Sequence, residues 1–410
     1  MVKHFKQFIL LAAALLVLTS CSKDDDATGG AAVSPARRTV IVYMAGENNL
    51  SGYIDGDISE MMAGRKLVGT NEQLVLFVDR ADKQQPPYIV RVTPDGKQEK
   101  LYQYEQDFYA SDPDAMRDVL ERCIAACPAA EDYGLVLWGP ANGWVIEKDS
   151  IATHRAYGID SGDNTAAYKG MMINMPTLRR VLEQLPIRFK YIFCDCCNMA
   201  NAETAYELRN MTDIFIGSPS EIPAEGAPYI KVVPDLFDHS ADFYKRIIDD
   251  YAEASYNKVP LAAINTAATA SLAAATRQVL AKVNQSVAES KLAGYIYYYN
   301  DYNKSTSQRQ HLMYDIKEVV RKALADDETA YQNWLSVLNQ TVLYQRLAKS
   351  WTTNQTIAIN FSDFTVTEEN FSGLSMFFPM EKYNSCSINY NEEIKKLAWY
   401  YAVGWSEVGW

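Results

Sequence analysis

Short apolar runs recur along the first half of the chain, and each has the length of one buried strand. The first reads TVIVYM, and the fourth reads YIFC and leads directly into polar and reactive residues. The runs are rich in β-branched and aromatic residues and apolar on both faces, as strands of a parallel sheet are. The five predicted strands are Thr39–Met44, Leu74–Val78, Gly134–Trp138, Tyr191–Cys194 and Ile214–Gly217.

Amphipathic helical stretches lie between these runs. The clearest one begins with Asp112 as N-cap and Pro113 at the first helical position, and its apolar spacing places Cys123 and Cys127 on the buried side. The helices predicted here are 113–127, 175–185 and 200–209. Strand and helix in repetition predict a three-layer α/β sandwich. Two further strands, 88–93 and 98–102, flank Pro94-Asp95-Gly96 and predict a hairpin.

The pattern changes after Pro228. Longer helices are predicted at 244–254, 268–289 and 312–325, followed by two strand-like runs at 356–361 and 373–378 and a terminal helix at 392–401. No stretch rich in Pro, Gly or Ser separates this half from the first. We therefore expect a core over 39–229 and a C-terminal α/β extension over 230–410 that packs on the same sheet.

Composition and charge exclude one class of partner. The chain of 410 residues is 48% hydrophobic and 22% charged, with a formal net charge of −12. No cluster of Lys and Arg is dense enough to contact a phosphate backbone, so nucleic acid is not an expected partner. The acidity favours basic ligands over acidic ones.

The N-terminus has the pattern of an export signal. Lys3 and Lys6 precede an apolar run too short to cross a bilayer, and Leu18-Thr19-Ser20-Cys21 resembles a bacterial lipobox. The resemblance implies that residues 1–20 are a signal peptide and that Cys21 carries a lipid in the membrane. Ser22 to Asp26 resembles the acidic export signal of Bacteroidetes lipoproteins, and residues 21–38 are predicted to be a lipidated, flexible tether. An outer-membrane lipoprotein at the cell surface is expected, with a periplasm-facing one as the alternative.

The run YIFCDCC contains a candidate nucleophile. Side chains alternate along a strand, so Asp195 and Cys197 share one face at the carboxyl end, where open α/β sheets bind ligands. A helix predicted to start near Asn198 would point N–H groups at Cys197 and favour its thiolate. A buried structural cysteine trio is the alternative interpretation. A zinc site is less well supported, because no second CxxC or HxxxH supplies the remaining ligands.

Six segments together resemble the clostripain family of cysteine peptidases. They are YMAGENNL, LVLWGPANGW, FCDCCNMANAETAYEL, GSPSEIPAEGAPY, MYDIKEV and GLSMFFP, in family order along the chain. The resemblance implies a caspase-like fold and cleavage after basic residues. It also implies that Cys197 stands at the nucleophile position and that Asp195 lines the pocket for a basic side chain.

The chain departs from the family pattern at the catalytic histidine. The family block is written Leu-x-Leu-Trp-x-His-Gly-x-Gly-Trp, and here Pro140 stands at the histidine position and Ala141 at the glycine after it. Proline cannot accept a proton from a thiol. The Ala141 backbone N–H can still contribute to an oxyanion hole. His154 is the nearest candidate for a displaced base, whereas His239 and His311 lie in the C-terminal half.

Three hypotheses follow for the function. The first is a degenerate, non-catalytic homologue that binds basic peptides through Asp195. The second is an active cysteine endopeptidase with His154 as base, and the third is a structural or interaction subunit of an envelope complex. We expect no cofactor and no metal, because Asp160-Ser161-Gly162-Asp163 lacks the remaining ligands of a calcium loop.

The lipobox can be tested by changing its cysteine. The protein is expected to fractionate with membranes, and Cys21→Ser is expected to release or mis-sort it, because the lipid supplies the membrane affinity. Membrane fractionation followed by immunoblotting measures this. Unchanged fractionation of Cys21→Ser would contradict the lipoprotein prediction.

Overall fold

The computed structural model describes residues 36–145, 157–167, 169–302, 309–353, 357–358, 364–386 and 388–410. Within these residues, a nine-stranded sheet has the strand order β13-β10-β9-β8-β5-β1-β2-β3-β4. Its parallel centre consists of β1 (Ala36–Gly46), β2 (Gln73–Arg80), β5 (Ala130–Trp138), β8 (Phe189–Asp195) and β9 (Thr212–Gly217). The antiparallel edges are β3 (Tyr88–Val92), β4 (Gln98–Gln103), β10 (Leu261–Asn265) and β13 (Val342–Arg346).

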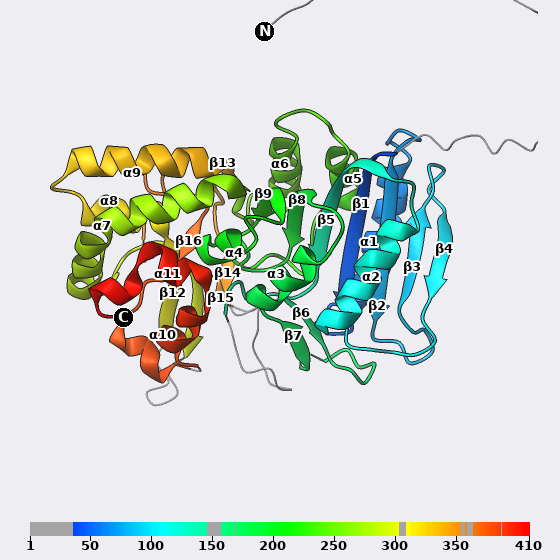
Figure 1. Ribbon diagram of the computed structural model, residues 1–410, viewed down its shortest axis with the longest axis horizontal. Helices are drawn as coiled ribbons and strands as arrows, with labels where there is room; N and C mark the ends of the chain where they lie inside the picture. The colour runs from blue at the N-terminus through cyan, green and yellow to red at the C-terminus, as the bar shows by residue number, and fades with distance from the viewer. Residues whose placement is uncertain are drawn as a thin grey trace, which may run out of the picture. The chain divides into compact units, whose positions relative to one another are not determined.

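The five strands predicted from apolar runs are all present, and they form the parallel centre. The predicted hairpin is β3 and β4, at one edge of the sheet. Figure 1 shows these blue and cyan strands at one end and the orange-to-red C-terminal elements at the other. The mostly parallel sheet with helices on it confirms the predicted α/β fold class.

Helices cover both faces of the sheet, so its central strands are apolar on both sides. On one face pack α2 (Pro113–Ala125), α3 (Met175–Glu183) and α4 (Ala202–Glu207). On the other face pack α1 (Ile54–Arg65), α5 (Tyr229–Leu236) and α6 (Tyr244–Ala254). Cys123 lies on the buried stripe of α2 as predicted, and Cys127 is half-buried just after this helix.

The C-terminal half adds strands to the sheet and builds a second, smaller sheet. Two of its strands, β10 and β13, extend the central sheet beyond β9. The second sheet contains β11 (Tyr297–Tyr302), β12 (Arg309–Asp315) and β16 (Ser375–Met376). The Ser375 N–H donates to the Ala200 carbonyl at 3.0 Å, and this bond ties the second sheet to the segment after β8.

Helices pack around this second sheet. They are α7 (Thr269–Ser290), α8 (Ile316–Ala323), α9 (Glu328–Thr341), α10 (Tyr390–Glu393) and α11 (Ala398–Val403). The small β14 (Thr352–Thr353) pairs with β15 (Ile357–Ala358), which is the described part of the predicted strand 356–361. No helix in the described part of the chain has the length and apolar character needed to cross a bilayer.

Two of the C-terminal segments that resemble the clostripain family bind each other. Asp315 of MYDIKEV is fully buried and accepts hydrogen bonds from the Ser372 N–H and hydroxyl, each at 2.8 Å. Its strand also pairs Tyr314 with Met376 of GLSMFFP. These two segments therefore hold the second sheet together and do not reach the candidate nucleophile.

Two predictions for the C-terminal half were wrong. Residues 312–315 belong to β12 and the helix begins only at Ile316, because Asp315 is its N-cap and accepts from the Lys317 N–H at 2.9 Å. The predicted terminal helix 392–401 is broken into α10, a 3₁₀ turn (Ile394–Lys396) and α11, with Leu397 in an extended conformation between them.

Candidate functional site

A cavity of about 510 Å³ opens at the carboxyl ends of the parallel strands. Segments that follow β1, β5, β8 and β9 all contribute to its wall, which is the expected place for a ligand in such a sheet. The lining residues are Asn49, Leu50, Trp138, Gly139, Pro140, Ala141, Asn142, Asp195, Cys197, Glu221, Ile222, Pro223, Ala224, Gly226, Lys258, Ser350, Trp351 and Thr352. The predicted site residues Cys197, Asp195, Pro140 and Ala141 are thus brought together.

Cys197 lies two residues beyond the end of β8 and is half-buried. Its Sγ accepts a hydrogen bond from the Ile222 N–H at 3.4 Å. The pKa of the Cys197 thiol is raised to about 12, first by burial, then by the negative charge of Glu221, and least by Asp195. The Ile222 N–H opposes this shift and does not overcome it. Cys197 is therefore held as a neutral thiol at physiological pH.

The predicted helix start at Asn198 was wrong, and with it the predicted activation of Cys197 by a helix N-terminus. The helix α4 begins at Ala202, where the Asn201 side chain caps it by accepting from the Thr204 N–H at 2.7 Å. Asn198 has a φ of +59°. Its N–H donates to the Ser220 carbonyl at 2.8 Å, and that of Ala200 donates to Ser218 at 2.8 Å. These two N–H groups are committed to the segment after β9 and do not point at the thiol.

Pro140 and Ala141 lie in the segment just after β5, and this segment forms one part of the cavity wall. The Pro140 carbonyl accepts from the Gly158 N–H at 2.9 Å, and Ala141 is bridged to Tyr157 of β6 (Tyr157–Asp160). Both contacts use the backbone, so they fix the position of this wall without supplying an ionisable group. Pro140, the residue predicted to replace a catalytic histidine, thus lines the same cavity as Cys197 and carries no proton acceptor.

Within the described residues, none that lines the cavity is a histidine. His239 contacts Glu72 at 2.9 Å between Nε2 and Oε1. His311 lies in β12, where its Nδ1 is 2.5 Å from Asn300 Oδ1 and its ring stacks on Tyr297. His154, the predicted alternative base, and the predicted lipidation residue Cys21 both lie outside the described residues.

Asp195 is buried and held by three hydrogen bonds. Oδ2 accepts from the Ala227 N–H at 3.0 Å and the Tyr229 hydroxyl at 2.7 Å, and Oδ1 accepts from the Tyr251 hydroxyl at 2.9 Å. Burial raises the pKa of Asp195, and these three donors act against that rise. A carboxylate offers about four acceptor positions, so one remains on Oδ1.

A second buried carboxyl group interacts electrostatically with Asp195. Asp57 of α1 is buried and accepts from Trp138 Nε1 at 2.7 Å. Burial, and then the charge of Asp195, raise the pKa of Asp57 to about 8. Asp57 is therefore largely protonated at pH 7, because burial disfavours its charged form and the charge of Asp195 adds repulsion.

The mostly parallel sheet, and the cavity with a cysteine at the carboxyl ends of its strands, are those of a caspase-like cysteine peptidase domain. The model of the clostripain family matches residues 42–410, and the chain belongs to that family. No similar protein was found among curated sequences.

Solved structures of two cysteine proteases have the same fold. One is a secreted C11 cysteine protease from Bacteroides thetaiotaomicron in complex with an irreversible peptide inhibitor, with 26% identity and a TM-score of 0.74 over 90% of this chain and 99% of that one. The other is an inactive zymogen C11 protease from Parabacteroides distasonis, with 24% identity, a TM-score of 0.72 and the same coverage.

Several cavity residues were not predicted from the sequence. Glu221 and Ile222 lie in the quoted block GSPSEIPAEGAPY, so their position in a family motif was the available signal. Lys258 and Trp351 come from the C-terminal half, in segments without a recognisable pattern. They reach the cavity only because β10 and β13 extend the central sheet.

The protonation of Cys197 can be tested by alkylation. With a pKa of about 12, the thiolate fraction rises about tenfold per pH unit between pH 7 and 10, and the rate of modification by iodoacetamide is expected to rise in parallel without a plateau. Mass spectrometry of the peptide that contains Cys197 measures the rate. A fast rate that is constant from pH 7 to 9 would contradict the neutral thiol.

Restoring the histidine provides a matched comparison. The double variant Pro140→His with Ala141→Gly is expected to alkylate faster at pH 7, because an imidazole in the same cavity stabilises the thiolate. The control is Pro140→Ala with Ala141→Gly, which changes the same backbone without adding a base. Equal rates in the two double variants would argue against Pro140 as the cause of the unreactive thiol.

Proposed function

We propose that this protein is a catalytically impaired member of the clostripain family, anchored at the cell envelope, that binds basic segments of peptides without cutting them. The observation that carries the proposal is that Pro140, which the sequence pattern aligns with the family's histidine, lines the same cavity as Cys197. The envelope location rests on the lipobox-like segment that ends at Cys21.

The contribution of a general base to catalysis and the small ionised fraction of the Cys197 thiol both support impaired catalysis. A positioned general base contributes roughly 10²–10⁴-fold to a reaction rate, and the members of a catalytic dyad act as a unit. A thiol whose pKa is about 12 is ionised in only about one molecule in 10⁵ at pH 7. The negative charge of Glu221 and the buried position of Cys197 both act in the direction opposite to activation.

The cavity retains features suited to a basic side chain. Asp195 keeps one open acceptor position on Oδ1, and Glu221 adds a second acidic group to the wall. Trp138 and Trp351 supply apolar surface for the aliphatic stem of an arginine or lysine. The secreted relative solved with an irreversible peptide inhibitor supports peptides as the ligand class.

Recognition of a basic side chain can be tested with a pair of peptides that differ in one charge. A short peptide with one central arginine is expected to bind at least tenfold more tightly than the same peptide with citrulline, which has the same shape and no charge. Isothermal titration calorimetry measures both affinities. Equal affinity for the two peptides would exclude basic recognition and favour a cavity that is not used.

Two variants locate the charge that is responsible. Asp195→Asn is expected to lower the affinity for the arginine peptide to that for the citrulline peptide. Asp326→Asn, which removes an exposed carboxylate that pairs with Lys282, is expected to leave both affinities unchanged. A melting curve of Asp195→Asn shows whether the Tyr229 and Tyr251 hydroxyls still find acceptors. Unchanged arginine affinity in a folded Asp195→Asn would assign recognition to another residue.

A further inference from the structure

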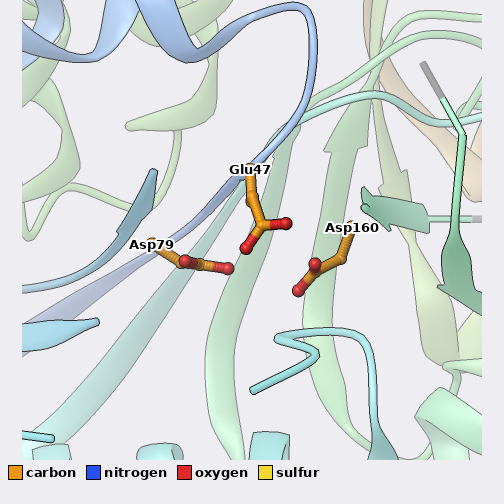
Figure 2. Close-up of side chains that lie close together, drawn as sticks. All are labelled: Glu47, Asp79 and Asp160. Atoms are coloured by element: carbon orange, nitrogen blue, oxygen red, sulfur yellow. The ribbon is translucent and has the colours of Figure 1, made fainter. Parts of the chain in front are cut away.

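Three carboxylates converge at the carboxyl edge of the central sheet, outside the wall of the cavity. Glu47 follows β1, Asp79 is the penultimate residue of β2, and Asp160 is the last residue of β6. One oxygen of each lies within 4.8 Å of one oxygen of each of the other two. Figure 2 shows the three side chains pointing at a common space. The exposed fraction is 0% for Glu47, 1% for Asp79 and 0% for Asp160.

Asp79 and one oxygen of Glu47 have no hydrogen-bond donor. Neither oxygen of Asp79 accepts a hydrogen bond from a donor group, and Oε2 of Glu47 accepts none. The side-chain neighbour of Asp79 is the acidic Asp160. In the described part of the chain, none of the three carboxylates forms an ion pair with a lysine, arginine or histidine. An unpaired carboxylate in the protein interior costs several kcal/mol, so these groups must either retain protons or have a positive group beside them that the surrounding side chains do not supply.

The surrounding backbone orients the other oxygens and leaves room for a ligand. Glu47 Oε1 accepts from the Ser161 hydroxyl and from the N–H groups of Asp163 and Asn164 at 3.0 and 2.9 Å. These bonds turn Oε2 toward the cluster. Asp160 Oδ1 accepts from the Gly162 N–H at 2.9 Å and Oδ2 accepts from the Ala110 N–H, so each oxygen retains one acceptor position.

The three carboxyl groups also destabilise one another's charged forms. The pKa of each is raised, in every case first by burial and then in part by the charge of neighbouring carboxylates, among them Asp107. Tyr43 faces the same space and brings no positive charge. The cluster can be neutralised in two ways, either by protons retained on the carboxyl groups or by a bound cation.

We propose that Glu47, Asp79 and Asp160 form a binding site for one divalent cation, Ca²⁺ in preference to Mg²⁺. The donor atoms are all carboxylate oxygens, which hard cations select, and neither histidine nor cysteine is present to favour zinc. Oxygens on opposite sides of Ca²⁺ lie about 4.6–5.2 Å apart, so three oxygens within 4.8 Å of one another fit around one ion. Mg²⁺ usually keeps several waters and takes one or two carboxylates, which suits a buried cluster of three less well.

The bound ion would stabilise the position of β6, the strand that supports one part of the cavity wall. Asn48, the neighbour of Glu47, donates from Nδ2 to the carbonyls of Ala45 at 2.8 Å and Ile159 at 2.9 Å. The strand β6, which ends at Asp160, begins with the residues that hold the backbone of Pro140 and Ala141. A cation that joins Asp160 to Glu47 and Asp79 would therefore fix β6 against the ends of β1 and β2. Its role is structural, because none of the three carboxylates lines the cavity.

Calorimetry on the purified full chain tests the site with the metal alone. After treatment with a chelator and its removal, the protein is expected to bind one equivalent of Ca²⁺, to bind Mg²⁺ more weakly, and to melt at a higher temperature in Ca²⁺ than in chelator. The absence of both binding heat and a melting shift up to about 5 mM Ca²⁺ would overturn the proposal and assign the neutralisation of the cluster to protons.

Two variants separate a cation site from a purely structural cluster. Asp79→Asn is expected to abolish Ca²⁺ binding and the melting shift. In chelator it is expected to melt no lower than the wild type, because it removes charge repulsion and the asparagine amide can still donate to Asp160. Asp95→Asn, which changes an exposed carboxylate paired with Lys97 in the β3–β4 turn, is expected to bind Ca²⁺ like the wild type. Undiminished Ca²⁺ binding by Asp79→Asn would place the ion elsewhere and refute the assignment.

Discussion

Parallel hydrogen bonding between β5 and β8, with Trp138 opposite Asp195, determines where every candidate residue lies. The two strands end at the same level. The segment after β5 therefore presents Pro140 and Ala141, and the segment after β8 presents Cys197, to one cavity. The neighbouring β1 adds Asn49 and Leu50, and β9 adds the segment that contains Glu221. A change in this register by one residue would move Asp195 from one face of the sheet to the other.

Buried carboxylates at this edge of the sheet are stabilised in two different ways. Asp195 receives hydrogen bonds from one backbone N–H and two tyrosine hydroxyls, so it needs no counter-ion to be accommodated. Asp79 receives none, and its neighbours Glu47 and Asp160 are acidic as well. The first arrangement suits a pocket that is open to a passing ligand. The arrangement around Asp79 suits a permanently bound ion. An ion at that place would hold β6, which supports the backbone of Pro140.

The parallel centre of the fold could be predicted from the sequence, because five fully buried strands leave continuous apolar runs. The turn after Cys197 could not be predicted from the sequence. Asn198 adopts a left-handed conformation and its N–H bonds to Ser220, a partner from the next strand, so the helix starts later than its periodicity indicated. A short apolar run such as 312–315 fits both a strand and a helix, and the sequence prediction chose the helix. In the structure this run is a strand, because it pairs with β11 and β16. The acidic cluster joins residues far apart in the chain, so no local loop pattern marked it.

The proposed function requires that Cys197 has no general base, and hydrolysis of a basic amide substrate tests this requirement most directly. Purified wild-type protein and Cys197→Ala are incubated with peptide amides that carry a reporter after arginine or lysine, and the release of the reporter is followed. The two proteins are expected to show the same background rate, because without a base the thiol is not ionised. Hydrolysis by the wild type that disappears in Cys197→Ala would contradict this expectation and make His154 the next residue to change.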